Sequence, residues 1–538
     1  MNTELSITLD PSEEKNQSII ERKILEQLAK KKIAAKKEEL IYIVEKKSID
    51  ARHRNIKIIL KYRVYINETP NGDGETLPEW KKADENKRVV IVGTGPAGLY
   101  AAFRLLEDGI KPILIDRGTD AESRKKDIDS IKNDGILNAN SNFCFGEGGA
   151  GTFSDGKLYT RSNKRGDIGK IYRIFVEFGA SEAILTDAHP HIGTDKLPGI
   201  ISAMRKKIIS LGGEFKFDSL CTDLIVEKSQ GGKKLRVTGV RTENVRTGEK
   251  SEIKGEKVIL ATGHSAADIY RMIARIAPNA LEAKTFAVGV RVEHPRSLID
   301  SIQFHGKPMP QAAEYRLTTQ AGGRGVYSFC MCPGGYVVPC ATAENQIVVN
   351  GMSASGRNSR WSNSAIVVER RPEDIPEDFR AQARKDGCEA LAGLYWRTWL
   401  EEETFRRANG QNAPAQRLTD FLSRRESKNL PESSYKPGLS LSRLDKWLPK
   451  EITSRLAEAF KSFDKSMSGF VCDDAVLIAS ETRTSTPVRI LRDKETLECT
   501  EIEGLYPCGE GSGYSGGIGS SAMDGERAAA QIAGAICK

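Results

Sequence analysis

The sequence contains no apolar run of the about 18 residues that a helix needs to cross a membrane. Its first residues, MNTELSITLDPSEEK, are acidic and contain no hydrophobic signal region, so they show no export signal. The chain has 538 residues, a length typical of two or three domains. Its composition, 39% apolar and 29% charged, is typical of globular domains. These features argue against a membrane-spanning protein and predict a cytoplasmic location.

Cysteine and histidine are scarce, with ten and six residues. The cysteines show no disulfide-scaffold spacing, so we expect free thiols in a cytosolic chain. Cys330, Cys332 and Cys340 lie close in sequence, but no histidine or second cysteine pair accompanies them, so we expect no metal site. Buried thiols are the favoured interpretation. Redox-active thiols at Cys330-x-Cys332 or Cys508 remain an alternative.

The net charge of +8 belongs to one segment. Residues 21–63 contain 14 Lys and Arg residues against 6 Asp and Glu residues, and the rest of the chain is balanced. This asymmetry predicts a basic N-terminal module on a neutral body. The module has no aromatic RNA-binding signature and no zinc-knuckle spacing, so nucleic acid is the less favoured partner.

The N-terminal module is predicted to be a small βαββ domain over residues 1–66. Asp10-Pro11-Ser12-Glu13 combines an N-cap residue, an early proline and a glutamate, which predicts a helix start. Residues 67–87 have almost no apolar content and are predicted to be a linker. Strands are expected over residues 5–9, 40–44 and 56–66.

Residues 88–118, RVVIVGTGPAGLYAAFRLLEDGIKPILIDRG, form a complete β-α-β pattern. Gly93, Gly95 and Gly98 follow an apolar strand at G-x-G-x-x-G spacing. In this fingerprint they permit a tight turn, the approach of a pyrophosphate, and close packing of helix on strand. The helix N-terminus attracts phosphate, and Asp116 ends the second strand where a ribose is bound. The pattern predicts dinucleotide binding.

A second glycine-rich segment follows at residues 141–158, SNFCFGEGGAGTFSDGKL. So many glycines are incompatible with regular structure and let a backbone approach a flat group closely. No second strand-GxGxxG-helix unit exists: Arg324 lies in GGRG, but no apolar strand precedes it. A separate NAD(P)H domain is therefore not expected.

Three distant segments fit one site: the fingerprint, the strand end A-T-G at 261–263, and GLYPCGE at 504–510 followed by a helix. This arrangement resembles the glutathione-reductase-like flavoproteins, in which one interrupted Rossmann domain binds FAD. The resemblance implies that Gly509-Glu510 replaces a Gly-Asp pair whose acid binds the ribityl chain. It also implies that a helix starting near residues 518–521 points its N-terminus at the flavin ring, where it stabilises the reduced anion.

Longer motifs extend the resemblance over nearly the whole chain. They resemble an uncharacterised family of FAD-dependent, or NAD/FAD-utilising, dehydrogenases, which implies FAD as cofactor and a redox role but names no substrate. The motifs are GEGGAGTFSDGKL, HIGTDKL, GHSAAD, FAVGVRVEHP, FCMCPGGYVV, NSA, ETRTSTPVRI and GLYPCGEGSGYSGGI.

The motifs and the resemblance together nominate a set of binding residues, while catalytic residues stay unassigned. On the substrate side, His191 lies in a turn, and Arg483 and Arg489 bracket TSTPV as candidates for binding an anion. The cofactor-binding candidates are Gly93, Gly95, Pro96, Ala97, Gly98, Asp116, Arg117, Gly148, Gly149, Gly151, Thr152, Thr262, Gly263, Gly509, Glu510 and Ile518.

The fold class expected is α/β: an interrupted Rossmann-type FAD domain, a mixed α+β substrate domain and the small N-terminal βαββ domain. The expected function is an FAD-dependent oxidoreductase acting on a small molecule. The alternatives are an RNA-associated flavoenzyme and a non-catalytic flavin-binding sensor or scaffold. The FAD domain is assigned to residues 88–160, 220–265 and 480–538, and the substrate side to 161–219 and 266–479.

Overall fold

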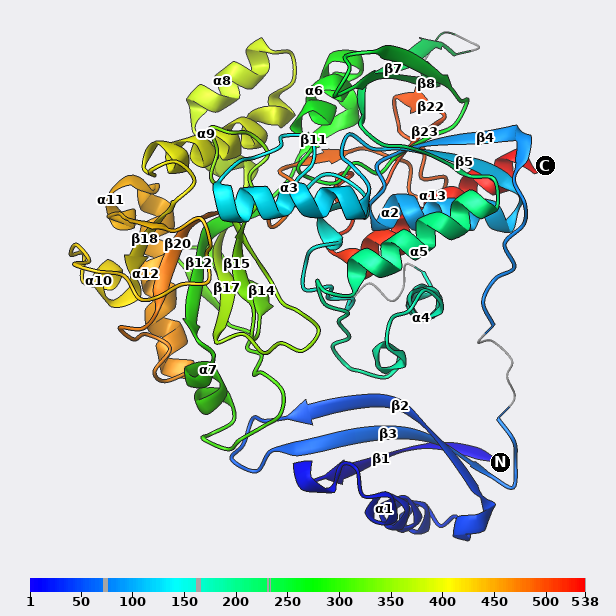
Figure 1. Ribbon diagram of the computed structural model, residues 1–538, viewed down its shortest axis with the longest axis vertical. Helices are drawn as coiled ribbons and strands as arrows, with labels where there is room; N and C mark the ends of the chain where they lie inside the picture. The colour runs from blue at the N-terminus through cyan, green and yellow to red at the C-terminus, as the bar shows by residue number, and fades with distance from the viewer. Residues whose placement is uncertain (71–75, 161–165, 230–231, 233, 538) are drawn as a thin grey trace.

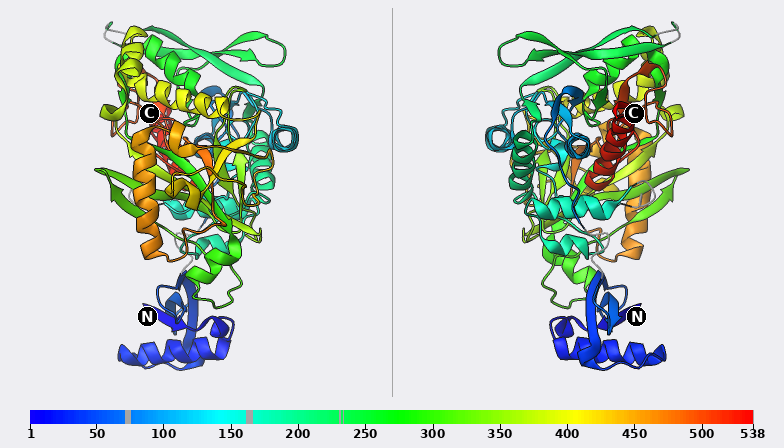
Figure 2. Two further views of the ribbon diagram at one scale, coloured as in Figure 1. Left: turned by 90° about the vertical axis from the view of Figure 1, so that its left-hand side faces the viewer. Right: turned by 90° about the vertical axis from the view of Figure 1, so that its right-hand side faces the viewer.

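The computed structural model describes residues 1–70, 76–160, 166–229, 232 and 234–537. No helix in these ranges is both long and apolar enough to cross a membrane. The N-terminal domain forms a separate lobe below the rest of the molecule (Figures 1 and 2). Its three antiparallel strands have the order β1-β3-β2, so the predicted βαββ arrangement is confirmed. Its elements are β1 (Asn2–Leu9), α1 (Gln17–Lys30), β2 (Leu40–Asp50) and β3 (Lys57–Ile66).

The start of α1 differs from the prediction. Asp10 to Glu13 form an isolated 3-10 turn, in which the Glu13 carboxylate accepts from the Asp10 N–H. The helix itself begins at Gln17, where the Asn16 side chain accepts from the Ile19 N–H. Two capping patterns lie close together in the sequence, and the second one has the apolar helical face directly behind it.

Five parallel strands in the order β23-β10-β4-β5-β6 form the central sheet of the body. Val89 and Ile91 of β4 face helices α2 and α13, while Val90 and Val92 face the opposite layer, as alternation along a strand requires. The strands are β4 (Asp84–Val92), β5 (Ile110–Ile115), β6 (Glu214–Lys216), β10 (Val258–Leu260) and β23 (Leu505–Pro507). The helices are α2 (Pro96–Glu107), α3 (Ala121–Asp134), α4 (Ile168–Glu177), α5 (Leu197–Ser210) and α13 (Ile518–Ile536).

Two boundaries differ from the sequence assignment. Strand β4 begins inside the predicted linker, and Trp80 packs on Phe103 with ring centroids 4.7 Å apart. Residues 71–75 of that linker lie outside the described ranges. Strand β6, which lies within the range 161–219 assigned to the substrate side, forms an edge of the parallel sheet.

A mixed four-stranded layer, antiparallel except for the β8–β22 pair, covers the other face of the parallel sheet. Strand β8 pairs with β7, β9 and β22, and Leu224, Val237 and Val240 pack in one core with Val90 and Leu260. The strands of this layer are β7 (Ser219–Lys228), β8 (Leu235–Asn244), β9 (Lys250–Lys254) and β22 (Ile502–Glu503).

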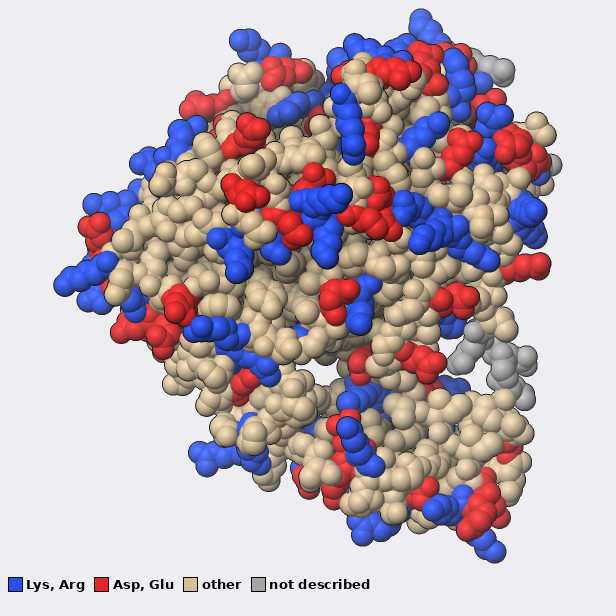
Figure 3. Space-filling view, viewed as in Figure 1, with Lys and Arg blue, Asp and Glu red and all other residues tan. Residues whose placement is uncertain are grey.

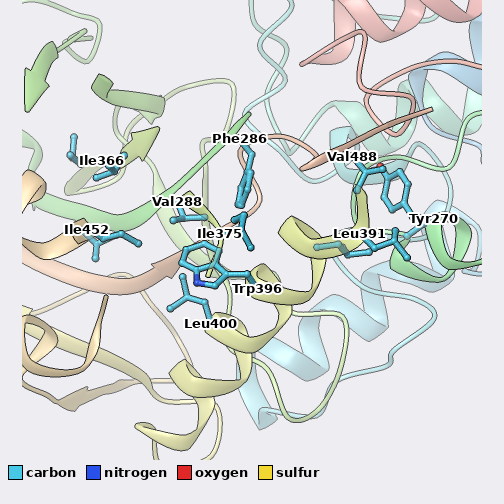
Figure 4. Packing of buried hydrophobic residues seen from close by; sticks show 14 of the residues in the cluster. Tyr270, Phe286, Val288, Ile366, Ile375, Leu391, Trp396, Leu400, Ile452 and Val488 are labelled. Carbon is cyan, nitrogen blue, oxygen red and sulfur yellow. The ribbon is translucent and has the colours of Figure 1, made fainter. Parts of the chain in front are cut away.

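A seven-stranded sheet in the order β13-β14-β17-β12-β20-β18-β19 forms the second half of the body. Trp396 of α9 packs beside Val288, Ile375 and Leu400 in the core of this half (Figure 4). The strands are β12 (Phe286–Pro295), β13 (Thr318–Ala321), β14 (Arg324–Cys332), β17 (Trp361–Arg370), β18 (Ala413–Arg417), β19 (Leu439–Leu441) and β20 (Val476–Glu481).

Short pairs and helices complete this half. Strands β11 (Leu281–Ala283) and β21 (Val488–Ile490) pair with each other, as do β15 (Tyr336–Pro339) and β16 (Val349–Met352). The helices are α6 (Ala267–Ile276), α7 (Arg296–Gln303), α8 (Glu377–Lys385), α9 (Ala392–Arg406), α10 (Leu418–Leu422), α11 (Leu444–Trp447) and α12 (Lys450–Ser466).

Candidate cofactor site

A cavity of about 790 Å³ lies where the carboxyl ends of the parallel strands meet the seven-stranded sheet. Ligands of open α/β sheets bind at this edge, and the volume is within the range of about 300–1,000 Å³ that ligand pockets span. Its walls come from the segment after β4, the ends of β5 and β10, the glycine-rich segment, the start of α13, and strand β14.

The turn between β4 and α2 has the geometry that its glycines predict. Gly93 has φ +104°, and a Cβ there would lie 2.4 Å from the Ala261 carbonyl oxygen. A Cβ on Gly98 would lie 2.0 Å from the Gly93 carbonyl oxygen, so Gly98 allows the helix to pack on the turn. Gly93, Gly95, Pro96 and Ala97 line the cavity, whereas Gly98 lies behind it.

The glycine-rich segment divides into residues that line the cavity and residues that support it. Gly149 and Gly151 line it, and a Cβ on Gly149 would lie 3.1 Å from the Gly95 Cα. Two backbones therefore approach each other here with no side chain between them, a cradle that fits an extended dinucleotide. Gly148 and Thr152, both nominated from the sequence, do not line the cavity. The Thr152 hydroxyl donates to the Glu147 carbonyl oxygen (2.7 Å), and a Cβ on Gly148 would overlap it.

Asp116 lines the cavity but already has four hydrogen-bond donors from the protein. Its Oδ2 accepts from the N–H (3.0 Å) and hydroxyl (2.7 Å) of Thr94, and its Oδ1 accepts from the N–H groups of Gly118 (3.0 Å) and Gly146 (3.1 Å). These bonds use the roughly four lone-pair positions of a carboxylate. Asp116 thus ties the turn after β4 to the glycine-rich segment, and a ribose would have to replace one of these donors.

Arg117 lines the cavity next to Asp116 and is held from two sides. Its guanidinium pairs with Asp268 and lies 4.4 Å from the ring centroid of Phe145. Both contacts orient a cationic group at the end of β5, where the adenosine half of a dinucleotide is expected.

The late segment reaches the cavity through Gly509 and Glu510, beside Thr262 and Gly263. The His264 ring bridges the Glu510 carboxylate, 3.0 Å from Nδ1, and the Arg483 carbonyl oxygen, 2.8 Å from Nε2. A carbonyl oxygen only accepts, so Nε2 donates. Nδ1 then faces the Glu510 carboxylate, so His264 holds this carboxylate in place against the backbone at Arg483.

Helices α2 and α13 both begin at the cavity wall. Their N-cap residues are Gly95 and Gly517, and within the described chain neither has a side-chain cap. Ile518 opens α13 and lines the cavity, as predicted for the start of this helix. Uncapped first turns present N–H groups and partial positive charge, which suit a pyrophosphate and an anionic ring.

Of the three substrate-side candidates, only Arg483 lines the cavity. Its guanidinium is buried and donates to Glu401 from Nε (3.0 Å) and from a terminal nitrogen (2.8 Å). His191 hydrogen-bonds the Ser355 carbonyl oxygen outside the cavity, and its neighbour His189 lines the wall in its place. Arg489 pairs with Glu282 and lies outside the lining, so its anion-binding role is not supported.

Several lining residues were not nominated from the sequence. Lys157 is near the end of the glycine-rich segment, lies 3.3 Å from a carboxylate oxygen of Asp155 and donates to the Met331 carbonyl oxygen. Cys144 and Asn350 also line the wall. Lys157 and Cys144 lie inside the quoted motif segments, so the signal was present there, but it did not show which side chains face inward.

Behind Asn350 lies a buried ion pair. Arg291 donates to Glu481 (2.9 Å) and to the side-chain oxygens of Asn363 (2.6 Å) and Asn350 (3.1 Å). Burial raises the pKa of Glu481 to about 7, against the opposing effect of Arg291. This pair joins β12, β17 and β20 behind the cavity lining. The described residues contain no group of three or more His, Cys, Asp or Glu side chains placed to hold a metal ion.

Comparison with known proteins agrees with this geometry. The chain is 38% identical over 533 residues to an uncharacterised protein of Clostridium beijerinckii (strain ATCC 51743 / NCIMB 8052), and the match covers 95% of each protein. Residues 285–484 match the family described as FAD-dependent protein, C-terminal domain-like. The chain belongs to the same family as this Clostridium protein, and its residues 285–484 form a domain of the FAD-dependent type. FAD is its cofactor, and residues 1–65 match a domain of unknown function, DUF8436.

Solved structures resemble the chain more distantly. A flavoprotein/dehydrogenase from Cytophaga hutchinsonii is 10% identical over 84% of this chain and 78% of that one, with a TM-score of 0.35. A flavocytochrome c3 fumarate reductase is 14% identical over 85% and 79%, also at 0.35. THI4 of Thermovibrio ammonificans is 18% identical over 37% and 66%, at 0.26. These scores are too low to contribute to the functional argument.

Replacing Gly149 by alanine is expected to weaken FAD binding at least about tenfold, because a Cβ there fills the cradle opposite Gly95. Gly149→Ala and the control Gly410→Ala both strain a backbone of similar φ, +60° and +63°, at a cost of about 1–2 kcal/mol each. Only Gly149 is at the cavity. Titration with FAD, followed by fluorescence, compares the two variants. Equal affinities of both variants for FAD would contradict the proposed cradle at Gly149.

Replacing Asp116 by asparagine is expected to destabilise the FAD-free protein by about 1.5–3 kcal/mol, the range for hydrogen bonds to charged groups. The amide nitrogen cannot accept from the donors that the carboxylate holds. Asp493→Asn, which removes a loop carboxylate that accepts from the N–H groups of Glu495 and Thr496, is the control for loop effects. An unchanged melting temperature with weaker FAD binding would instead show that Asp116 acts through a ribose contact alone.

Proposed function

We propose that the protein is an FAD-dependent oxidoreductase of the glutathione-reductase-like type, acting on a small molecule. One observation carries the proposal: a single cavity has two uncapped helix N-termini on one wall and β14 with Arg483, Lys157 and Asn350 on the other. FAD supplies hydride transfer when bound. The opposite wall gives a substrate polar groups to bind while it lies against the cofactor.

The lining supports an assignment of parts of FAD to parts of the wall. Gly93, Gly95 and the first turn of α2 would hold the pyrophosphate, with Arg117 at the adenosine end. Thr262, Gly263, Gly509 and Glu510 would hold the ribityl chain. Ile518 and the first turn of α13 would face the ring, and their positive potential would favour the reduced, anionic form.

The residues of the chain have defined tasks in this proposal. The His264–Glu510 contact keeps the Glu510 carboxylate oriented toward the cavity, beside the ribityl position. Arg291 fixes Asn350, and Lys157 presents a cationic group to a substrate. We also propose that the protein is cytoplasmic, as the sequence predicts.

The alternative of an RNA-associated flavoenzyme finds no specific support. Basic side chains of the N-terminal domain are paired with acidic ones: Lys61 and Arg63 with Glu4 and Glu45, and Lys47 with Glu14. On the face drawn in Figure 3, Lys and Arg side chains of this lobe are interspersed with Asp and Glu. Cations held in ion pairs are less available for the phosphate contacts on which nucleic-acid backbone recognition depends.

The experiment for the proposed function is cofactor release followed by anaerobic reduction. Purified protein is expected to be yellow and to release FAD, not FMN or NAD, on denaturation. Anaerobic addition of metabolites is then expected to bleach the flavin absorbance with one substrate class, and air is expected to restore it. A flavin that no metabolite reduces would favour the scaffold alternative. A colourless protein that FAD does not reconstitute would contradict the whole site.

Replacing Glu510 by glutamine is expected to raise the flavin midpoint potential, because it removes a negative charge beside the cofactor. A shift on the order of 30 mV corresponds to about 1.4 kcal/mol for two electrons. The control is Glu503→Gln, because Glu503 lies on β22 and pairs with Arg236 outside the cavity lining. Potentials measured by dye equilibration that are equal in both variants would show that Glu510 does not act on the flavin.

A further inference from the structure

Two cysteines that are far apart in the sequence meet beside the cavity. Cys144 belongs to the glycine-rich segment and lines the cavity, and Cys340 directly follows β15 and lies behind the lining. Their Sγ atoms are 3.5 Å apart although 196 residues separate them in the sequence. A disulfide needs about 2.05 Å between sulfurs, so the two sulfur atoms have to approach by about a further 1.5 Å to form one.

The two thiols differ in surroundings. Cys144 Sγ lies 3.7 Å from a terminal nitrogen of Arg483, whose guanidinium is fixed by Glu401. Cys340 is buried in an apolar cluster with Val338 and Val348. The Cys144 thiol therefore lies beside a cation and faces the cavity, whereas the Cys340 thiol is shielded from the cavity.

The electrostatics follow this difference. The hydrogen bond with Cys340 and the charge of Arg483 hold the pKa of the Cys144 thiol below its usual value, against burial. The same hydrogen bond and burial raise the pKa of the Cys340 thiol. A thiolate is the reactive form of cysteine, so Cys144 is the better nucleophile of the pair.

We propose that Cys144 and Cys340 are a redox-active dithiol pair, with Cys144 as the attacking thiol and Cys340 as the resolving thiol, and that the pair is oxidised by low-molecular-weight disulfides. This site is separate from the flavin reaction proposed above and does not depend on it. Closing it joins the glycine-rich segment of the FAD domain covalently to the substrate-side sheet.

The chemistry balances in two exchange steps. The Cys144 thiolate attacks one sulfur of a disulfide RSSR, which forms a mixed disulfide and releases RS⁻. The Cys340 thiol loses its proton to solvent and attacks the Cys144 sulfur, which forms the Cys144–Cys340 disulfide and releases the second RS⁻. The dithiol loses two electrons, and RSSR gains them as two thiolates.

The test equilibrates FAD-loaded, full-length protein with glutathione and glutathione disulfide without oxygen, followed by acid quenching, alkylation and peptide mass spectrometry. The expected product is a Cys144–Cys340 peptide pair lighter by two hydrogens. In Cys340→Ser and Cys340→Ala, glutathione should instead remain attached to Cys144. Cys388→Ser is the matched control, because Cys388 is buried and donates to the Pro278 carbonyl oxygen outside the cavity lining.

The pH dependence of alkylation provides a second readout in the wild-type protein. Cys144 should react with iodoacetamide about tenfold faster than Cys388 at neutral pH, and its rate should level off below the ordinary thiol pKa of about 8.5. The proposal is overturned if no Cys144–Cys340 peptide forms at any glutathione ratio, or if Cys330 and Cys332 form the disulfide in its place. It is also overturned if Cys144 and Cys388 are alkylated at equal rates. None of these outcomes requires a variant to fold.

Discussion

The site depends on how closely helices α2 and α13 cross. A Cβ on Gly525 would lie 1.9 Å from the Ala97 carbonyl oxygen, and one on Gly509 would lie 3.0 Å from the Ala97 Cβ. Only glycine permits this approach of two helices and a strand end. Because the crossing is so close, both helices begin at the same cavity, and two N-termini can act on one cofactor.

The rest of the site secures the segments that this crossing brings together. Asp116 accepts from Thr94, Gly118 and Gly146 and so joins the first turn to the glycine-rich segment. His264 joins the end of β10 to Glu510 and to the backbone at Arg483. These contacts link residues that are distant in the sequence. A cofactor bound among them would bring together the FAD domain and the sheet that carries the family match, which is why cofactor affinity and stability should be coupled here.

The sequence identified the local parts of this arrangement correctly. The β-α-β unit, its glycine turn and the start of α13 depend on neighbouring residues, and each has a local signature. The sequence pattern did not reveal which glycines of 146–151 face the cavity, because this depends on backbone turns that tertiary packing determines. Nor did it show that protein donors already saturate Asp116, or that Arg489 pairs with Glu282. The meeting of Cys144 with Cys340 is a tertiary contact between residues in separate motifs, and spacing alone contains no information about it.

We propose that FAD lies along one cavity, with its pyrophosphate at the start of α2 and its ring at the start of α13. A crystal structure of the FAD-bound protein tests this most directly. We expect phosphate oxygens to accept from N–H groups of the first turn of α2 beside Gly95 and Gly149, and the ring to lie next to Gly517 and Ile518. FAD density outside this cavity, or with the ring at the first turn of α2, would contradict it.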